Sequence, residues 1–389
     1  MKVVGVLILL LGGVWGYTRL WGRIVGGKIR YSVTISEGRP REGEEIELRT
    51  ILENTAWLPV PWLQLSQPLP EGTVLLEEGG GSHLLRYATY LLPRQRVQRI
   101  HRLRCVRRGL QILPTAEIRY SDGLGWEERM ERLESGCRIL VRPKPMERDA
   151  IPFRFREWIG EVAVRRWYQE DPSRLWGVRQ FRPGDPYRHI HWAASARTGK
   201  WLVKQFETSS RTVLYGVLNH QLFEPHWLGS SPRRVDAQCR LAAALFRRSE
   251  ELGLEYGLYS NGSWRGRRSF SIPPGRSPEH LEAVETALGR LLPQAQEPLA
   301  DLLRRIREEV SNPSFFVVMT GYWDENLTSA AEELRRRGHD LILVCFREPD
   351  EKVEGLDSAA SLPLVTVTCW SERRGRHEAD GCREGRDPA

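Results

Sequence analysis

The sequence predicts an α+β multidomain protein built from an N-terminal transmembrane helix, a β-sandwich and a doubly wound α/β domain. Three patterns predict it: an uncharged apolar run at the start, period-two alternation in short segments, and a later alternation of strand-like with helix-like segments. The expected divisions are a transmembrane anchor, a β-sandwich, a junction segment, an α/β domain and a disordered tail, over residues 1–21, 30–143, 144–210, 211–370 and 371–389.

The apolar run is Val3–Thr18, which carries no charge and lies between Lys2 and Arg19. A spanning helix needs about 20 residues and at least about 17, so the run is short unless the flanking basic side chains snorkel. Trp21 extends its apolar surface. We therefore expect residues 1–21 to be a single-pass anchor in a lipid bilayer.

Cleavage of this segment as a signal peptide is not expected. A cleavage site needs small residues, and the first alanine of the chain is Ala56. Four of the five basic residues within positions 1–30 follow the apolar run. The positive-inside rule then places the bulk of the protein in the cytoplasm, at the cell membrane.

The net charge of +8 is concentrated at the N-terminus, because residues 1–30 carry five basic residues and no acid. The rest of the chain therefore carries only +3, which argues against nucleic acid as a partner, since that needs a basic face on a folded domain. The six cysteines are scattered, without C-x-x-C pairs or zinc-ligand spacing, so free thiols are expected. No cofactor is expected.

Residues 30–143 have the pattern of β-structure. Ile46, Leu48, Thr50 and Leu52 alternate with more polar neighbours, as in a half-buried strand. Further short apolar runs follow at regular spacing, separated by turns rich in proline and glycine. This spacing predicts an immunoglobulin-like β-sandwich.

From residue 211 onward the pattern changes to strands alternating with helices. Val213–Leu218 is expected to be the first buried strand, 235–252 an amphipathic helix and 365–369 the last strand. Alternation of this kind predicts a mostly parallel sheet covered by helices. The last residues are charged and almost without apolar side chains, which predicts disorder.

Residues 178–207, called the signature segment below, contain the densest group of special residues. Pro183 and Gly184 suit the centre of a tight turn, and Asp185 is expected to cap a helix that Pro186 begins and Gly199 ends. Three apolar residues are expected on one face of that helix: Tyr187, Ile190 and Ala194. Residues 201–206 are expected to form a strand.

The polar residues of this segment have two competing interpretations. In the first, they fix the fold internally: Asp185 caps the helix and pairs with Arg188, and Arg179 or Arg182 joins Glu207. In the second, they form a docking surface for an acidic or phosphorylated partner. The candidate interaction residues are Arg179, Arg182, Gly184, Asp185, Arg188, His191, Trp192, Ser195 and Arg197.

A hydrolase is the alternative to a binding role. Ser195, His191 and Asp185 are the residue types of a nucleophile, a base and an orienting acid, and positions 191 and 195 are neighbours on one face of a helix. No nucleophile elbow or oxyanion hole accompanies them. We therefore expect no catalytic residues here and a protein that is not an enzyme.

A family resemblance rests on motifs found in order along the chain: Gly43-Glu44-Glu45, Asn54, Leu58-Pro59, Pro70-Glu71-Gly72, Arg108-Gly109, Asp122-Gly123-Leu124, Arg182-Pro183-Gly184-Asp185, Arg188, Ile190-His191-Trp192, Ser195-Ala196-Arg197 and Phe206-Glu207. They resemble the domain of unknown function 58 family of prokaryotic proteins. The resemblance implies a membrane-anchored partner of a MoxR-type AAA+ ATPase, with a β-rich domain followed by a von Willebrand factor A-like domain. The implied function is a non-enzymatic interaction or scaffold role in cell-envelope or complex-assembly processes.

A metal site in that A-like domain is not expected. Such a site would begin with Asp-x-Ser-x-Ser after the first strand, because the ion prefers a carboxylate and two compact hydroxyls. Here Asn219, Gln221 and Phe223 stand at the three positions.

Overall fold

The computed structural model describes residues 2–36, 38–76, 81–165, 170–208, 213–264, 270–348 and 356–369. The chain divides into two compact units: residues 1–144 with 285–291, and residues 145–284 with 292–389. The expected disordered tail, 371–389, lies outside the described residues.

The first unit contains one long helix followed by strands. Their bounds are α1 (Lys2–Val25), β1 (Ile29–Ile35), β2 (Glu45–Asn54), β3 (Val60–Pro68), β4 (Thr73–Leu75), β5 (Leu84–Leu91), β6 (Arg96–Cys105), β7 (Gly109–Ile112), β8 (Ala116–Ser121), β9 (Glu128–Leu133) and β10 (Arg138–Val141). The strands form antiparallel sheets in the orders β1-β2-β6-β4, β5-β3-β8-β9 and β10-β7.

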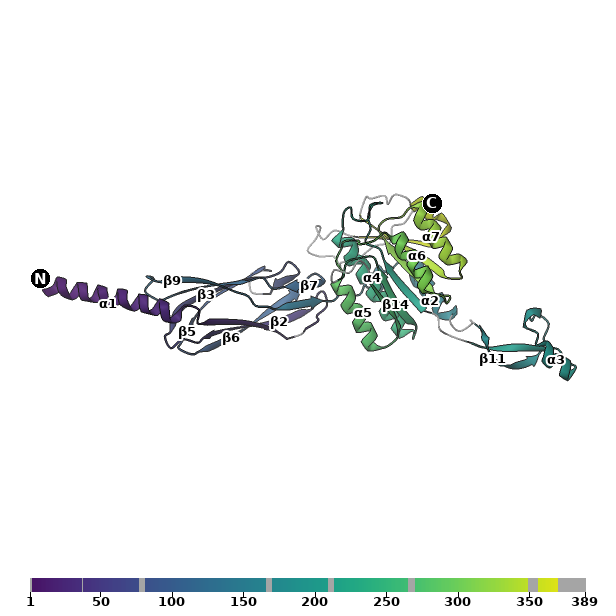
Figure 1. Ribbon diagram of the computed structural model, residues 1–389, viewed down its shortest axis with the longest axis horizontal. Helices are drawn as coiled ribbons and strands as arrows, with labels where there is room; N and C mark the ends of the chain where they lie inside the picture. The colour runs from purple at the N-terminus through teal and green to yellow at the C-terminus, as the bar shows by residue number, and fades with distance from the viewer. Residues whose placement is uncertain are drawn as a thin grey trace. The chain divides into compact units, whose positions relative to one another are not determined.

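Strand β2 lies where the alternating pattern predicts a strand. Ile46, Leu48, Thr50 and Leu52 are all buried, whereas Arg49 between them is exposed. Leu52 packs in one cluster with residues of β3 and β8, and Leu48 packs in another with residues of β5 and β10. The two four-stranded sheets therefore pack face to face with the core between them, and β2 lies opposite β3 (Figure 1).

The expected transmembrane anchor is wrong. Within the part of the chain that the structure describes, no helix combines the length and the apolar character needed to cross a membrane. The run Val3–Thr18 is interrupted by glycines and is followed by Arg19 and Arg23. The end of the helix packs against the strands instead, because Trp21 and Val25 are fully buried in the core of the sandwich.

Trp21 shows how α1 is joined to the strands. Its indole nitrogen donates to the Pro59 carbonyl at 2.8 Å, and its ring meets that of Tyr120 edge-on, with centroids 6.0 Å apart. The residue that sequence reasoning assigned to a bilayer is thus a core residue. The expected single-pass placement at a membrane has no support, and contact of residues 1–21 with lipid stays an untested prediction.

The second unit alternates helices and strands. Its elements are η1 (Arg148–Ala150), α2 (Phe153–Arg165), β11 (Glu170–Gln180), η3 (Tyr187–His189), α3 (Trp192–Thr198), β12 (Leu202–Thr208), β13 (Val213–Leu218), α4 (Pro232–Glu251), β14 (Glu255–Ser260), β15 (Phe270–Gly275), α5 (Pro278–Arg290), α6 (Leu299–Glu309), β16 (Phe315–Thr320), α7 (Glu325–Arg336), β17 (Asp340–Arg347), η4 (Leu356–Ser361) and β18 (Leu364–Thr368). Residues 285–291, at the end of α5, group with the first unit.

A mostly parallel sheet is the centre of this unit, with strand order β15-β14-β13-β16-β17-β18. Only β15 pairs antiparallel, at one edge. After β13 the chain adds β14 on one side and later β16 on the other, so the strand order reverses at β13. In open α/β sheets such a reversal marks the crevice at the carboxyl ends of the strands.

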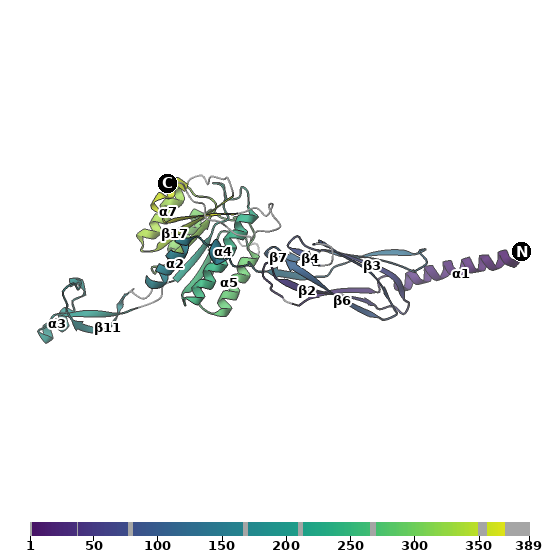
Figure 2. The ribbon, with the colours of Figure 1, turned by 180° about the vertical axis from the view of Figure 1, so that it is seen from behind.

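Helices cover both faces of this sheet. Val213, Tyr215 and Val217 pack with α6 and α7. Gly216 faces the other way, toward Phe246 of α4, and a Cβ at this position would lie 2.7 Å from the ring. Both views show α4 and α7 on opposite sides of the strands (Figures 1 and 2).

Helix α2 and strand β15 are among the elements of this unit that have no counterpart in the sequence interpretation. Helix α2 lies inside the segment expected to be a junction, and its Phe155, Ile159 and Val162 are buried. Strand β15 contains Pro273 and Pro274, which are unfavourable inside a sheet. Its position at the edge explains how they are tolerated.

Candidate functional site

The signature segment forms a two-stranded ribbon, β11 and β12, whose connection we call the tip segment, residues 181–201. The strands pair antiparallel, with Arg179 opposite Val203, and Phe181 N donates to the Trp201 carbonyl at 2.8 Å. Ile190 bridges to Val203, and both are buried, with 2% and 3% of their surfaces exposed. The tip segment therefore folds back on β12, with α3 beside it (Figure 1).

A charged turn opens the tip segment. Arg179 donates from both terminal nitrogens to the Asp185 carboxylate, at 2.6 and 2.7 Å. The same carboxylate accepts from Arg182 N at 2.8 Å, and Asp185 N donates to the Arg182 carbonyl at 3.1 Å. Gly184 has a φ of 106°, a conformation that favours glycine. The Arg179 hydrogen bonds, and then that from Arg182 N, lower the pKa of Asp185 to about 2.

The expected helix cap at Asp185 is wrong, because its carboxylate is bound to Arg179 and to the turn. Asp185 also pairs with Arg179 rather than with the expected Arg188. His191 caps α3 instead: its Nδ1 accepts from Ala194 N at 3.2 Å. Gly199 ends the helix with a φ of 66°, as predicted.

The expected single helical face is also wrong, since its three residues belong to different elements. Tyr187 lies in the short turn η3, Ile190 in the bridge to β12 and Ala194 in α3. Pro186 precedes η3, which is too short to hold them on one face. The expected pairing of Glu207 involves a side chain outside those described.

The proposed hydrolase residues are each held by other partners. Ser195 Oγ accepts from Leu202 N at 2.9 Å and donates to the Leu202 carbonyl at 3.4 Å. His191 and Asp185 are bound as described above. No hydrogen bond joins any two of these three side chains, all of which lie within described residues. Ser195 thus connects α3 to β12.

Aromatic side chains stand on the outside of the tip segment. The Phe181 ring stacks on Tyr187 at a centroid distance of 5.8 Å and meets Trp201 edge-on at 5.6 Å. Tyr187 is 69% exposed and Trp201 55% exposed. Trp192, the first residue of α3, is 68% exposed. Sequence reasoning missed Tyr187 and Trp201 as surface residues, although three aromatic residues flanking one turn were a usable signal.

The basic residues of the tip segment are mostly uncompensated. Asp185 is the only acid between residues 178 and 204, and Arg179 already binds it. The cations that the structure describes as exposed are Arg182, Arg188, Arg197 and Lys200. Arg188 Nε lies 3.3 Å from His189 Nε2, and no carboxylate among the described residues pairs with these four.

An amide network lies at the carboxyl ends of β13 and β16. Asn219, just after β13, donates to Thr320 Oγ1 at 2.7 Å and accepts from Gln221 N at 3.0 Å and from Asn261 Nδ2 at 2.7 Å. Asn219, Thr320 and Asn261 are buried. Among the described residues, no cluster of three or more histidine, cysteine or acidic side chains is placed to hold a metal ion. Metal independence itself stays a prediction.

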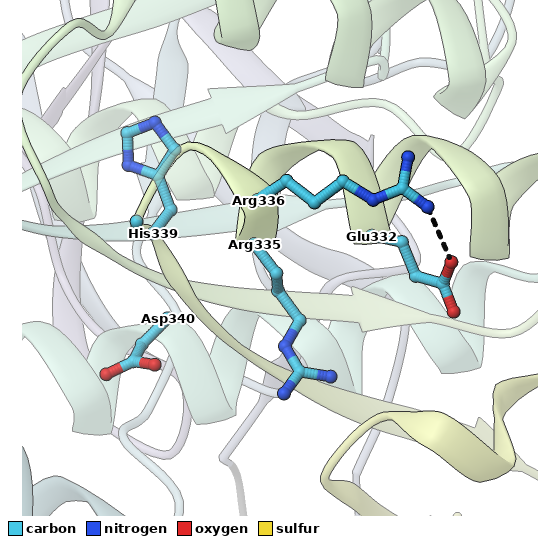
Figure 3. Close-up of a pocket in the computed structure, with 6 residues that line it drawn as sticks. Glu332, Arg335, Arg336, His339 and Asp340 are labelled. Carbon is cyan, nitrogen blue, oxygen red and sulfur yellow. Dashed lines mark ion pairs between the residues drawn. The ribbon is translucent and has the colours of Figure 1, made fainter.

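A hollow of about 410 Å³ lies beside the end of α7, lined by Glu332, Arg335, Arg336, Gly338, His339 and Asp340. Its side chains do not converge (Figure 3): Arg336 pairs with Glu332 at 3.7 Å, and the His339 ring points away from both arginines. His339 Nδ1 accepts from Ser314 N at 3.2 Å. Burial, and then Arg337, lower the pKa of His339. The hollow therefore has no group of side chains aimed at a common ligand.

Comparison with known families finds a match over part of the chain. Residues 177–356 match the family described as "Protein of unknown function DUF58". This DUF58 match includes the tip segment and most of the α/β sheet. The uncharacterized protein YeaD of Bacillus subtilis is 22% identical over 294 residues, which are 75% of this chain and 69% of that protein. The resemblance seen in the signature motifs is confirmed at this level, whereas the MoxR association and the A-like assignment stay predictions.

Solved structures resemble parts of the chain only weakly. A CARDB domain from Pyrococcus furiosus is 11% identical, with a TM-score of 0.21, and the match covers 29% of this chain and 93% of that one. A cohesin from Archaeoglobus fulgidus is 10% identical, with a TM-score of 0.21, and the match covers 29% of this chain and 91% of that one. Likenesses at these scores carry no argument about function.

Proposed function

We propose that this chain is a non-enzymatic protein-interaction protein whose partner is an AAA+ ATPase of the MoxR class, and that its α/β unit is von Willebrand factor A-like. The partner class comes from the resemblance of the signature motifs. The structure supports the binding role through one observation above the others. The polar groups that a hydrolase would need hold the backbone of the tip segment in shape.

The bonding of the signature residues favours binding over catalysis. A nucleophile and its base must reach each other and a common substrate atom. Ser195 instead binds backbone atoms of Leu202, and His191 binds the backbone of Ala194. These hydrogen bonds hold the backbone of the tip segment while its large aromatic and basic side chains remain exposed, which is the arrangement that a protein-binding surface needs.

The A-like assignment is supported by the sheet. The unit is a parallel sheet with one antiparallel edge strand and helices on both faces, and its strand order reverses at β13, where ligands bind in folds of this class. The amide of Asn219 and the hydroxyl of Thr320 bind each other there. We infer a domain that binds a protein without a metal ion, in cell-envelope or complex-assembly work.

The test is direct binding of the purified chain to a purified MoxR-class ATPase encoded in the same genome. We expect a complex in sedimentation velocity and a changed rate of ATP hydrolysis when the chain is added. An AAA+ ATPase of another class, under the same conditions, is the control. Absence of a complex with the MoxR-class enzyme, or equal binding to both enzymes, would overturn the partner assignment.

A further inference from the structure

Trp192 is the most distinctive exposed side chain of the tip segment. Its surface is 68% exposed although it begins a helix whose ends are both fixed, by His191 and by Gly199. Within the described residues its ring meets no other ring, and its indole N–H has no acceptor. A tryptophan has only two rotatable side-chain bonds, so ordering this large side chain on a fixed backbone costs little conformational entropy when it binds.

Small residues surround this tryptophan on α3. Ala193 and Ala196 are both exposed, and Ala196 lies one helical turn after Trp192, on the same face. The face therefore combines the flat indole ring with small apolar side chains beside it. Such a surface accommodates an aliphatic or aromatic side chain of a partner, because nothing bulky on the helix shields the ring.

The charge around this face has one sign. Arg182, Arg188, Arg197 and Lys200 are exposed, and Asp185, the one acid of the tip segment, is already paired with Arg179. A partner surface that supplies negative charge is favoured here, because like charges brought together cost several kcal/mol and opposite charges speed the encounter. Carboxylates are the matching groups.

We propose that the tip segment is a docking surface for an acidic protein segment that places an apolar side chain against Trp192 and its carboxylates among the surrounding arginines. Applied to the MoxR-class ATPase, this rests on the proposed function. The chemistry of the surface does not depend on which protein carries the acidic segment.

An acidic protein fits this surface better than a nucleic acid. The exposed basic residues of the tip segment lie between Arg182 and Lys200, in a short patch around Trp192 rather than along a long basic face. Nucleic-acid affinity depends on many phosphate contacts along such a face. A local patch around one apolar anchor is typical of a protein hot spot.

The experiment measures binding of the full chain to three probes: the MoxR-class ATPase, a fluorescein-labelled peptide that alternates glutamate with leucine, and a labelled single-stranded oligonucleotide. The tested variants are Trp192→Ala and the double variant Arg188→Glu with Arg197→Glu. The matched controls are Trp227→Ala, which removes an indole that is 75% exposed outside the tip segment, and Arg102→Glu, at an exposed position of β6. Circular dichroism melts check that every variant folds.

We expect Trp192→Ala to weaken peptide binding about thirtyfold, the change typical of a hot-spot side chain. The charge-reversal variant should bind still more weakly, and its binding should lose the dependence on salt seen in the wild type. The control variants should bind as the wild type does. If the wild type binds the ATPase, its binding should show the same pattern.

The outcomes separate the two proposals. Peptide binding that depends on Trp192, without any ATPase binding, supports the docking surface and overturns only the choice of partner. ATPase binding that is equal in Trp192→Ala and in the wild type overturns the docking surface and leaves the partner intact. Tighter binding of the oligonucleotide than of the peptide, or no peptide binding by folded wild type, overturns the docking surface.

Discussion

Arg179 and Asp185 are joined by two parallel hydrogen bonds across the start of the tip segment, at 2.6 and 2.7 Å. Two-point contacts between guanidinium and carboxylate fix orientation as well as distance. Arg179 belongs to β11 and Asp185 to the turn, so the pair sets the direction in which the chain leaves the ribbon. The shape of the turn that precedes Trp192 therefore depends on Asp185, whose negative charge is already neutralised by Arg179.

Loss of this pair should loosen the tip segment. We expect Asp185→Ala to speed hydrogen exchange at Arg182 N and at the amides of residues 189–203, because the turn loses the acceptor that closes it. Lys200→Ala and Lys204→Ala should leave exchange unchanged, since neither lysine is part of the turn. Mass-spectrometric exchange would measure this. Unchanged exchange in Asp185→Ala, together with lost partner binding, would mean that the acid acts in recognition instead.

Acid should loosen the same segment. The pKa of Asp185 is lowered from 3.8 to about 2, so the carboxylate is more acidic in the folded ribbon than in the unfolded chain. Its contribution to stability is therefore complete above the unfolded pKa and is lost as the pH falls from about 4 through about 2. NMR titration of the Asp185 carboxyl carbon would measure this. A midpoint near the ordinary value would contradict the pairing.

Local patterns predicted several elements of the fold because those elements depend on local chemistry. The alternation at Ile46 and Leu48 places β2, and the left-handed conformation of Gly199 ends α3, without help from distant residues. The predicted cap at Asp185 is wrong because a competing donor, Arg179, lies across the turn and binds the carboxylate. Spacing along a helix cannot reveal such a partner, nor that His191 is free to cap α3.

The prediction of an N-terminal transmembrane helix was wrong for a related reason. Hydropathy treats Trp21 as apolar surface to be covered, but it does not say what covers it. The sandwich covers it, through Tyr120 and the Pro59 carbonyl, and both lie far along the sequence. The amide network of Asn219 could not be predicted from local patterns either. Asn219 could be recognised as a non-acid, but its bonds to Thr320 and Asn261 require the folded sheet.

Trp21→Ala should destabilise the first unit by about 3–5 kcal/mol, the usual cost of deleting a buried tryptophan. The indole is fully buried, and its removal also leaves the Pro59 carbonyl without a donor from this ring. Trp57→Ala is the control, because Trp57 is 63% exposed and its loss should change little. Urea unfolding of both variants gives the comparison. Equal midpoints would mean that α1 is not part of the core.

His339 should make the second unit sensitive to mild acid. Burial and Arg337 lower the pKa of His339 below 6.5, so the unfolded chain binds its proton more readily than the folded chain. Stability from this group is therefore present above about pH 6.5 and declines as the pH falls below it. His339→Gln, which keeps an acceptor for Ser314 N, should lose less stability on acidification. The control is His83→Gln, at an exposed position; equal losses in all three proteins would contradict the argument.

The α/β unit should be indifferent to divalent metal. The side-chain amide nitrogen of Asn219 donates to Thr320 Oγ1, and its side-chain oxygen accepts from Gln221 N and Asn261 Nδ2, so no lone pair is left aimed at an ion. A specific site present at about 100 times its dissociation constant would add roughly 2.7 kcal/mol to stability. Thermal melts in Mg²⁺, Mn²⁺ and EDTA would measure this, with a metal-binding A domain as the positive control. The prediction is contradicted if either ion reproducibly stabilises the wild type and this stabilisation is lost in Thr320→Ala, because that result would show a metal site at the amide network.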